Sequence, residues 1–189
     1  MSRQCLDIVL PNQHGFYPGR STTTNLVSYV ETLLGALETG VQVDAVYTDF
    51  SRAFDRVNHN LLIAKPRAIG FHRRLLNWLE IFLRGRVQVV RVGSFFSREI
   101  RVPSGVPQGA HCSPLLFNLF VNDLNQYIIN CDFLMFADDL KLFKPVKSHL
   151  DMAVLQSDVS GLAYLCSLNG LSLNVFGYKF LSAWNETPI

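Results

Sequence analysis

The stretch that decides the fold is Phe133-Leu134-Met135-Phe136-Ala137-Asp138-Asp139-Leu140-Lys141-Leu142-Phe143. Its two adjacent carboxylates, Asp138 and Asp139, interrupt an otherwise apolar run. A buried carboxylate has to be paired, hydrogen-bonded or metal-bound to stay ionised, so folding this stretch requires a compensating partner. Neighbouring side chains of a strand point to opposite faces, so both aspartates reach one site only where the chain turns. We therefore predict a β-hairpin over residues 131–143 with its turn at the aspartates, although an ordinary Asp-Asp turn explains the pair equally well.

A third carboxylate, Asp49, ends a second apolar segment. Val43, Ala45, Tyr47 and Asp49 share one face of a strand by their period of two, so this carboxylate is expected at the end of a half-buried strand. Three carboxylates from two strands form a cluster of hard oxygen ligands that suits Mg²⁺. Two such ions activate a hydroxyl and stabilise a leaving oxygen in phosphoryl transfer, with Mn²⁺ as an alternative ion.

The remaining pattern predicts an α+β fold. Capping residues, apolar periods and turn signals mark the ends of each expected helix and strand. The order of the elements implies an antiparallel sheet covered by helices on one face. The expected helices cover about 21–38 (with an apolar stripe of Leu26, Val30, Leu33, Leu34 and Leu37), 58–70, 72–83, 113–124 and 148–168 (with Leu150, Val154, Leu155, Val159, Leu162 and Leu165 inward); the other expected strands cover about 86–92 and 96–102, joined at Gly93-Ser94, and 171–175 and 178–184.

Composition fits a single domain, or part of a larger one, with a sizeable core. The chain has 189 residues, 49% of them hydrophobic, and no stretch that reads as a transmembrane helix or a secretory signal. Four scattered cysteines are typical of a reducing compartment, so an intracellular protein is expected, with nucleus and cytoplasm unresolved. The net charge is only +2, but residues 65–101 carry a local balance of +7. Such segregation suits a phosphate backbone as partner, although a solvated basic face explains this segment alone.

Several motifs together resemble the reverse transcriptase domain of non-LTR (LINE-type) retrotransposons over about residues 12–183. They occur in order and at sensible spacing, and the set is far more specific than a lone Asp-Asp pair. The stretches are Gln13-His14-Gly15-Phe16 with Gly19-Arg20-Ser21-Thr22, Thr48-Asp49-Phe50-Ser51-Arg52-Ala53-Phe54-Asp55, Ser104-Gly105-Val106-Pro107-Gln108-Gly109 with Ser113-Pro114-Leu115-Leu116-Phe117, Phe136-Ala137-Asp138-Asp139, and more weakly Asn169-Gly170-Leu171-Ser172-Leu173-Asn174.

The resemblance implies the palm of a right-hand polymerase with part of the fingers. The implied reaction is RNA-directed DNA synthesis, in which a primer 3′-hydroxyl attacks the α-phosphate of a deoxynucleotide. The implied partners are therefore an RNA template, a DNA primer and a dNTP, with no membrane. The resemblance makes Asp49, Asp138 and Asp139 the catalytic residues and, with the Phe50 carbonyl, the ligands of two Mg²⁺ ions. Asp55 competes as a fourth carboxylate, but capping or orienting the following turn suits it better.

Further contacts are implied by the same resemblance. Phe54 matches the position whose ring lies under the incoming sugar and excludes a 2′-hydroxyl, although a core phenylalanine is the commoner fate of such a residue. Gln108 matches a residue that touches the incoming nucleotide, although a loop before the next helix explains its glycine-flanked turn. The implied nucleotide-binding residues are Ala53, Phe54, Pro107, Gln108 and Gly109, and the implied nucleic-acid-binding residues are Arg20, Arg84, Arg86, Phe136 and Ala137.

The chain also departs from the family. We expect a partial domain, with residues 12–40 fingers-like and 41–183 forming a palm with inserted fingers elements, and with the N-terminal fingers, the thumb and an endonuclease absent. Tyr17 stands where an arginine is common, Pro66 falls inside an expected helix, and Gly177 replaces a usual lysine. Two interpretations thus remain, an active RNA-directed DNA polymerase domain and a catalytically dead, truncated remnant that keeps the fold and some RNA affinity.

Overall fold

The computed structural model describes residues 8–174 and 179–183. The chain divides into two compact units, one of residues 1–51 with 121–189 and one of residues 52–120. The assignment of fingers-like and palm parts remains a prediction.

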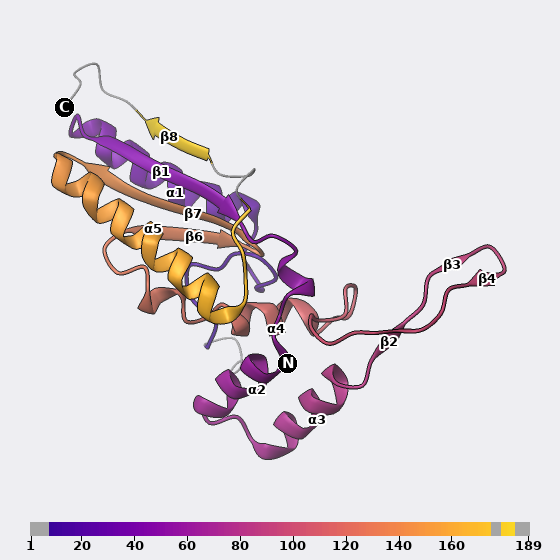
Figure 1. Ribbon diagram of the computed structural model, residues 1–189. Helices are drawn as coiled ribbons and strands as arrows, with labels where there is room; N and C mark the ends of the chain where they lie inside the picture. The colour runs from indigo at the N-terminus through magenta and orange to yellow at the C-terminus, as the bar shows by residue number, and fades with distance from the viewer. Residues whose placement is uncertain (1–7, 175–178, 184–189) are drawn as a thin grey trace. The chain divides into compact units, whose positions relative to one another are not determined.

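The first unit is built on a four-stranded sheet in the order β6-β7-β1-β8 (Figure 1). All three pairings are antiparallel, and they join β6 (Asp132–Phe136) to β7 (Asp139–Val146), β7 to β1 (Gln42–Asp49), and β1 to β8 (Lys179–Ala183). The predicted hairpin and the predicted strand ending at Asp49 are thus confirmed. The antiparallel sheet with helices confirms the predicted α+β class.

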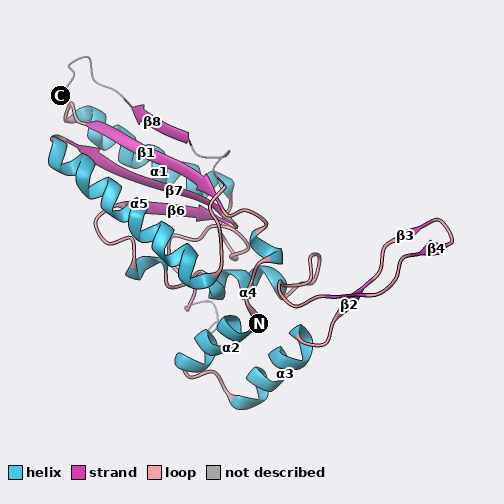
Figure 2. Cartoon of the chain, in the orientation of Figure 1, coloured by secondary structure: helices cyan, strands magenta, loops and turns pink. Residues whose placement is uncertain are grey.

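Helices lie on both faces of this sheet, so the expectation of helices on one face alone was wrong. Figure 2 shows the strands between α5 (His149–Asn169) in front and α1 (Thr22–Glu38) behind. Helix α1 contacts β1 and β6, and α5 contacts β7. The order of elements along the chain did not decide this, because one helix precedes β1 and the other follows β7, and either can reach either face.

Helix α1 begins and ends where the sequence predicts, but it buries a different stripe. Ser21 caps it, since its side chain accepts a hydrogen bond from the Thr24 backbone. The side chains turned to the sheet are Tyr29 and Ala36, with Leu33 half-buried beside them, in a cluster that includes Val43 of β1. The other predicted stripe residues are exposed, and they are Leu26, Val30, Leu34 and Leu37.

Helix α5 follows its prediction closely. Ser148 is its N-cap and Gly170 ends it with a φ of 68°, a conformation that glycine adopts without strain. Leu155, Leu162 and Leu165 are buried, as expected. Leu150, in the first turn of the helix, is 73% exposed, so its inward placement was wrong.

The second unit contains three α-helices, a single-turn helix and a long hairpin. The single-turn helix η2 (Ala53–Asp55) leads to α2 (His59–Ala68) and α3 (Arg73–Leu83), which are N-capped by Asn58 and His72. Short strands pair across the hairpin, β2 (Val87–Gln88) with β5 (Ile100–Arg101) and β3 (Arg91–Val92) with β4 (Phe95–Phe96), as predicted around Gly93-Ser94. Pro66 lies in the last turn of α2, so the prediction of a proline inside this helix is confirmed. It has no N–H to donate to the carbonyl four residues back.

Three element predictions need adjustment. Helix α4 spans Ser113–Phe120, so it ends earlier than predicted, and the single-turn helix η3 (Leu124–Gln126) follows after a turn. The strand expected over 171–175 is reduced to one bridge between Leu173 and Phe50 within the described residues. Residue 175, the position Gly177, and the ends of the last predicted strand, Tyr178 and Trp184, lie outside those residues. No helix in the described part of the chain is long and apolar enough to cross a membrane.

Candidate active site

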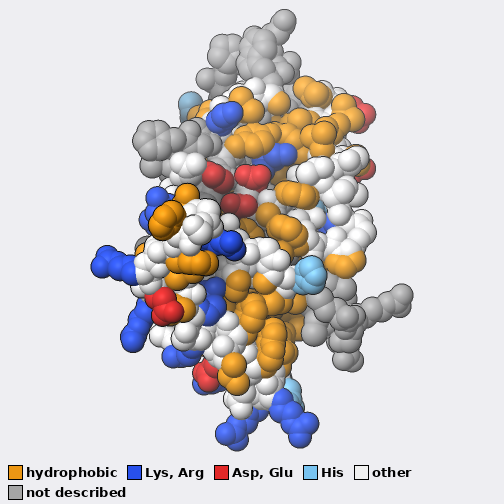
Figure 3. All heavy atoms as spheres, turned by 90° about the vertical axis from the view of Figure 1, so that its right-hand side faces the viewer, with side chains coloured by type: hydrophobic (Ala, Val, Ile, Leu, Met, Phe, Trp, Pro, Cys, Tyr) orange, Lys and Arg blue, Asp and Glu red, His pale blue; other side chains and the backbone are white. Residues whose placement is uncertain are grey.

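The sheet brings the three predicted carboxylates to one end of β1 and β7. Asp49, the last residue of β1, is paired with Asp139, the first residue of β7, and Asp138 lies in the turn just before it. Directly opposed residues of antiparallel strands have their side chains on the same face, so Asp49 and Asp139 lie on one face at the same level. Figure 3 shows a group of acidic side chains among apolar ones on the face seen there, with basic side chains beside it.

The carboxylates interact electrostatically. Burial raises the pKa of Asp138, an opposing hydrogen bond from its own backbone lowers it in part, and the charge of Asp49 raises it further. Burial, then Asp138, then Asp49 raise the pKa of Asp139. The charge of Asp49 therefore makes ionisation of Asp138 and Asp139 less favourable, and a bound cation would relieve this repulsion.

Asp49 leaves one ligand atom unused. Its Oδ2 accepts a hydrogen bond of 3.2 Å from Asn174 Nδ2, and its backbone carbonyl accepts one of 2.9 Å from the Asn174 backbone. Its Oδ1 is buried without a hydrogen-bond partner. A buried carboxylate oxygen with no donor suits a cation, so the donor set fits a divalent ion. Among the described residues, however, no three Asp, Glu, His or Cys side chains form a ready-made metal cage, and the two-ion site remains a prediction.

An open cleft of about 480 Å³ lies against this end of the sheet. Asp49 and Asp139 line it together with Phe136, which is paired with Asp139 across the hairpin. Asn25, near the start of α1, also lines it and donates a hydrogen bond of 3.0 Å to the Met135 carbonyl. The other lining residues are Tyr47, Thr48, Leu134, Leu140, Lys141 and Lys179.

The hairpin turn is held by a residue to which the sequence assigned no role. Gln13 is 2% exposed, and its Oε1 accepts hydrogen bonds from Gly15 N (2.7 Å) and Ala137 N (3.0 Å). Its Nε2 donates to the Ala137 carbonyl at 3.1 Å. Ala137 has a φ of 58°, which is strained for a residue with a Cβ, and Gln13 satisfies both of its backbone groups. The Gln13-His14-Gly15-Phe16 motif was the available signal, but a contact across 124 residues is not readable from it.

Gly15 allows this close approach. A Cβ at this position would lie 2.2 Å from Ala137 N, well inside any allowed contact. The His14 backbone also donates to the Met135 carbonyl at 2.8 Å, so residues 13–15 run along β6. Residues 13–15 therefore form a clamp on the turn that carries Asp138.

In the second unit, the predicted nucleotide-binding residues gather around one turn. The ring of Phe54 stacks on that of Phe117 with centroids 4.9 Å apart, so it has a packing role whatever else it does. Gln108 donates from Nε2 to Asp55 Oδ1 at 3.0 Å, which places Asp55 as an orienting partner of Gln108. Gln108, Pro107 and Asp55 line an open cleft of about 550 Å³. Ala53 is buried, and Gly109 adopts a φ of 84° in the same loop as Gln108.

The predicted nucleic-acid-binding arginines already make hydrogen bonds within the chain. Arg20 Nη1 donates to the carbonyls of Pro11 (2.6 Å) and Gln13 (2.7 Å), and its guanidinium lies over the Tyr17 ring. Arg86 donates to the Gly105 carbonyl at 2.6 Å. Contact of these arginines with a nucleic acid remains a prediction.

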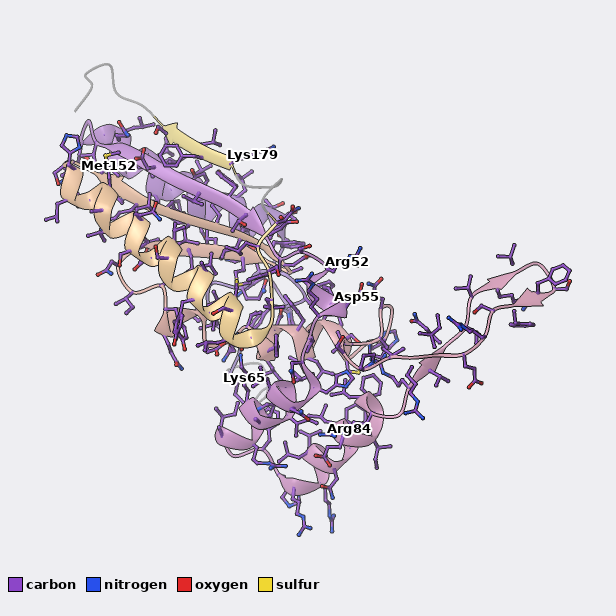
Figure 4. The ribbon with its side chains drawn as sticks, viewed as in Figure 1. Arg52, Asp55, Lys65, Arg84, Met152 and Lys179 are labelled. Carbon is purple, nitrogen blue, oxygen red and sulfur yellow. The ribbon has the colours of Figure 1, made fainter. Side chains whose placement is uncertain are left out.

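The other three predicted nucleic-acid contacts differ in exposure. Arg84, labelled at the end of α3 in Figure 4, donates to Asn60 Oδ1 at 2.8 Å. Phe136 is half-buried in the cleft wall, whereas Ala137 is buried in the turn. Of the residues near the hairpin, Phe136 is therefore better placed than Ala137 to touch a ligand.

Comparison with known proteins places these features in one family. The family described as "Reverse transcriptase (RNA-dependent DNA polymerase)" matches residues 2–177. A probable RNA-directed DNA polymerase from transposon BS of Drosophila melanogaster is 35% identical over 117 residues, which are 61% of this chain and 13% of that relative. A Pol polyprotein of the type-1 retrotransposable element R2 of Popillia japonica is 25% identical over 177 residues, 87% of this chain and 24% of that protein.

Solved structures agree on the fold. A telomerase of Candida tropicalis superposes with a TM-score of 0.69 at 13% identity, covering 93% of this chain and 37% of that one. A telomerase of Candida albicans, solved with a fragment of telomeric RNA, also gives 0.69, at 12% identity over 98% of this chain and 33% of that one. The chain thus spans well under half the length of the relatives and structures that it matches.

Proposed function

Because the chain belongs to the reverse transcriptase (RNA-dependent DNA polymerase) family, we propose that it forms the catalytic palm of an RNA-directed DNA polymerase of the non-LTR retrotransposon type. Its substrates are a dNTP and a DNA primer paired with an RNA template. The observation that carries the proposal is the pairing of Asp49 with Asp139, which both line an open cleft, next to Asp138.

Reverse transcriptases generally use divalent metal ions, and the carboxylates of Asp49, Asp138 and Asp139 would hold two Mg²⁺ ions with the Phe50 carbonyl. The ions would lower the pKa of the primer hydroxyl and stabilise the charge on the departing pyrophosphate. The buried Oδ1 of Asp49 and the raised pKa values of Asp138 and Asp139 support this use of the site.

The chain's own residues contribute positioning, because phosphoryl transfer leaves little covalent chemistry to the protein. The clamp of residues 13–15 holds the peptide of Ala137 and so fixes where the Asp138 carboxylate starts. Asp55 orients the amide of Gln108, which contacts the incoming nucleotide. Phe54 stacks on Phe117, and its ring excludes a 2′-hydroxyl from the sugar pocket.

Primer extension on poly(rA)/oligo(dT) with Mg²⁺ tests the function. We expect the unsubstituted chain to extend the primer and Asp138→Asn and Asp139→Asn to lose extension. Asp132→Asn is the matched control, because it removes the same charge from an exposed position at the far end of the hairpin. No extension by the unsubstituted chain, or equal extension by all variants, would overturn the proposal; the first result would favour the catalytically dead remnant.

A further inference from the structure

A row of side chains crosses the sheet one step behind the carboxylates. Tyr47 of β1 is paired with Lys141 of β7 on one side and with Lys179 of β8 on the other. Paired residues of antiparallel strands share a face, so the two lysines flank the tyrosine on the face that carries Asp49 and Asp139. Figure 4 labels Lys179 on β8. The three residues of this row, called here the cationic row, all line the same cleft as the carboxylates.

The ammonium of Lys141 is held by aromatic rings instead of a carboxylate. Its Nζ lies 3.9 Å from the centroid of the Tyr29 ring and 5.1 Å from that of Tyr47. The two rings meet edge to face with centroids 6.2 Å apart, so they form a rigid seat for the cation. The two rings therefore hold the ammonium group of Lys141 in place in the wall of the cleft before any ligand binds.

This charge is incompletely compensated. The described contacts of the Lys141 Nζ are with the faces of the Tyr29 and Tyr47 rings. A half-buried ammonium whose neighbours are ring faces gains from an anionic ligand that restores the lost solvation. Lys179 is exposed on the edge strand β8 and adds a second positive charge to the same cleft.

We propose that Lys141 and Lys179 bind the phosphate backbone of a nucleic-acid strand whose end reaches the carboxylates of Asp49 and Asp139. This inference rests on the proposed function and names a contact surface for its polymeric substrate. The cationic row lies two residues back along β1 and β7, about 6.7 Å from the carboxylate row. The lysines stand on alternate strands about 10 Å apart. A nucleic-acid strand that lies across the cleft in this direction would have its phosphates bound by the two lysines and its reacting end at the carboxylates.

A polymer suits this arrangement better than a free nucleotide. The carboxylates repel any small anion that binds at Lys141, because both groups lie in one cleft. A strand gains from several separate phosphate contacts and from release of its counterions, which offsets that repulsion.

Oligonucleotide binding in EDTA at a series of salt concentrations tests the inference without turnover. The probe is a fluorescent DNA primer annealed to an RNA template, and the variants are Lys141→Met, Lys179→Met and the double variant. The slope of log affinity against log salt should become shallower by about 0.9 for each lysine–phosphate pair that a variant removes, and by about twice that in the double variant. Lys141→Arg keeps the charge and should keep the slope.

Lys144→Met is the matched control. Lys144 lies on the same strand but pairs with Asp44, on the opposite face, where its Nζ donates to the Asn130 carbonyl. Equal slopes for Lys141→Met and Lys144→Met would overturn the inference, as would no binding by the unsubstituted chain, or abolished binding of a free dNTP with primer-template binding intact. Because no catalysis is measured, a chain that fails primer extension can still support the inference.

Discussion

Asp49 and Asp139 are paired across β1 and β7, so two carboxylates share one face and one level of the sheet. Like charges directly opposite each other destabilise a sheet. Asp138 adds a third charge in the adjoining turn, and burial strengthens the effect on Asp138 and Asp139. The fold therefore carries a local electrostatic repulsion at this end that a bound cation would relieve.

Neutralising Asp49 should stabilise the chain when divalent ions are removed. We expect Asp49→Asn to raise the free energy of unfolding by about 0.5 kcal/mol in EDTA, because it removes a cross-strand repulsion. With Mg²⁺ the order should reverse, since binding to the native state stabilises the unsubstituted chain more. Thermal unfolding with EDTA and with Mg²⁺ measures both effects. Asp132→Asn should show neither, and a Mg²⁺ response of Asp49→Asn equal to that of the unsubstituted chain would contradict the metal assignment.

Removing the amide of Gln13 should loosen the turn that carries Asp138. Gln13→Ala leaves the backbone N–H groups of Gly15 and Ala137 without their acceptor, which costs about 3 kcal/mol of stability. The direct readout is hydrogen exchange of the Ala137 amide, which should lose its protection. Gln156→Ala, which truncates an exposed glutamine of α5, serves as the control and should leave this exchange unchanged. If the Ala137 amide is as well protected in Gln13→Ala as in the unsubstituted chain, Gln13 does not hold the turn.

Protonation of the Asp158 carboxylate at acid pH should lower the free energy of unfolding. This carboxylate accepts hydrogen bonds from the backbone N–H groups of Ile129, Asn130 and Cys131. Burial by itself would raise the pKa of Asp158, but the hydrogen bonds from Asn130 and Cys131 outweigh it and hold this pKa below 3.8. The stability that the ionised carboxylate of Asp158 adds is therefore present above the pKa of 3.8 in the unfolded chain, and it is lost as the pH falls through the lower pKa in the folded chain.

Urea unfolding near neutral pH and well below pH 3.8 measures this contribution. We expect Asp158→Ala to lose about 3 kcal/mol at neutral pH, because three backbone N–H groups and the side-chain amide of Asn130 lose their acceptor. The difference in the free energy of unfolding between Asp158→Asn and the unsubstituted chain should become smaller at acid pH, where the carboxylate of Asp158 is protonated. A gap that is constant with pH would show that the charge of Asp158 contributes nothing.

Phe54 can be tested for two separate roles. Phe54→Val removes both the stacking on Phe117 and the bulk that excludes a 2′-hydroxyl, so it should lower stability and raise ribonucleotide incorporation. Phe117→Leu removes the stacking alone and should lower stability without changing sugar selection. Primer extension with matched ribonucleotides and deoxynucleotides compares the two variants. Unchanged sugar selection in Phe54→Val would leave Phe54 as a core residue only.

Features set by local chemistry were predictable from the sequence. Ser21 and Ser148 begin helices, and Gly170 ends one, because capping depends on residues within one turn. The hairpin turn followed from two adjacent aspartates within an apolar run, and the end of β1 followed from the period-two alternation that leads to Asp49.

Features set by distant contacts were not predictable. The buried stripe of α1 is built on Tyr29 and Ala36 and not on most of the predicted leucines, because the pattern of an apolar helix does not say which side meets the sheet. The clamp formed by Gln13 joins residues 124 positions apart. The seat of Lys141 needs Tyr29 from a helix and Tyr47 from a strand, which no local pattern brings together.

The sequence by itself determined that Asp49, Asp138 and Asp139 stand at the ends of apolar strands, because the period of a strand and the chemistry of a turn are local. Only the tertiary structure decided that β1 pairs with β7 in the register that sets Asp49 opposite Asp139. If the pairing register of β1 against β7 shifted by one residue, the side chains of Asp49 and Asp139 would no longer lie opposite each other on the same face of the sheet. Register is chosen by hydrogen bonds and burial along the whole sheet, and these join segments far apart in the chain.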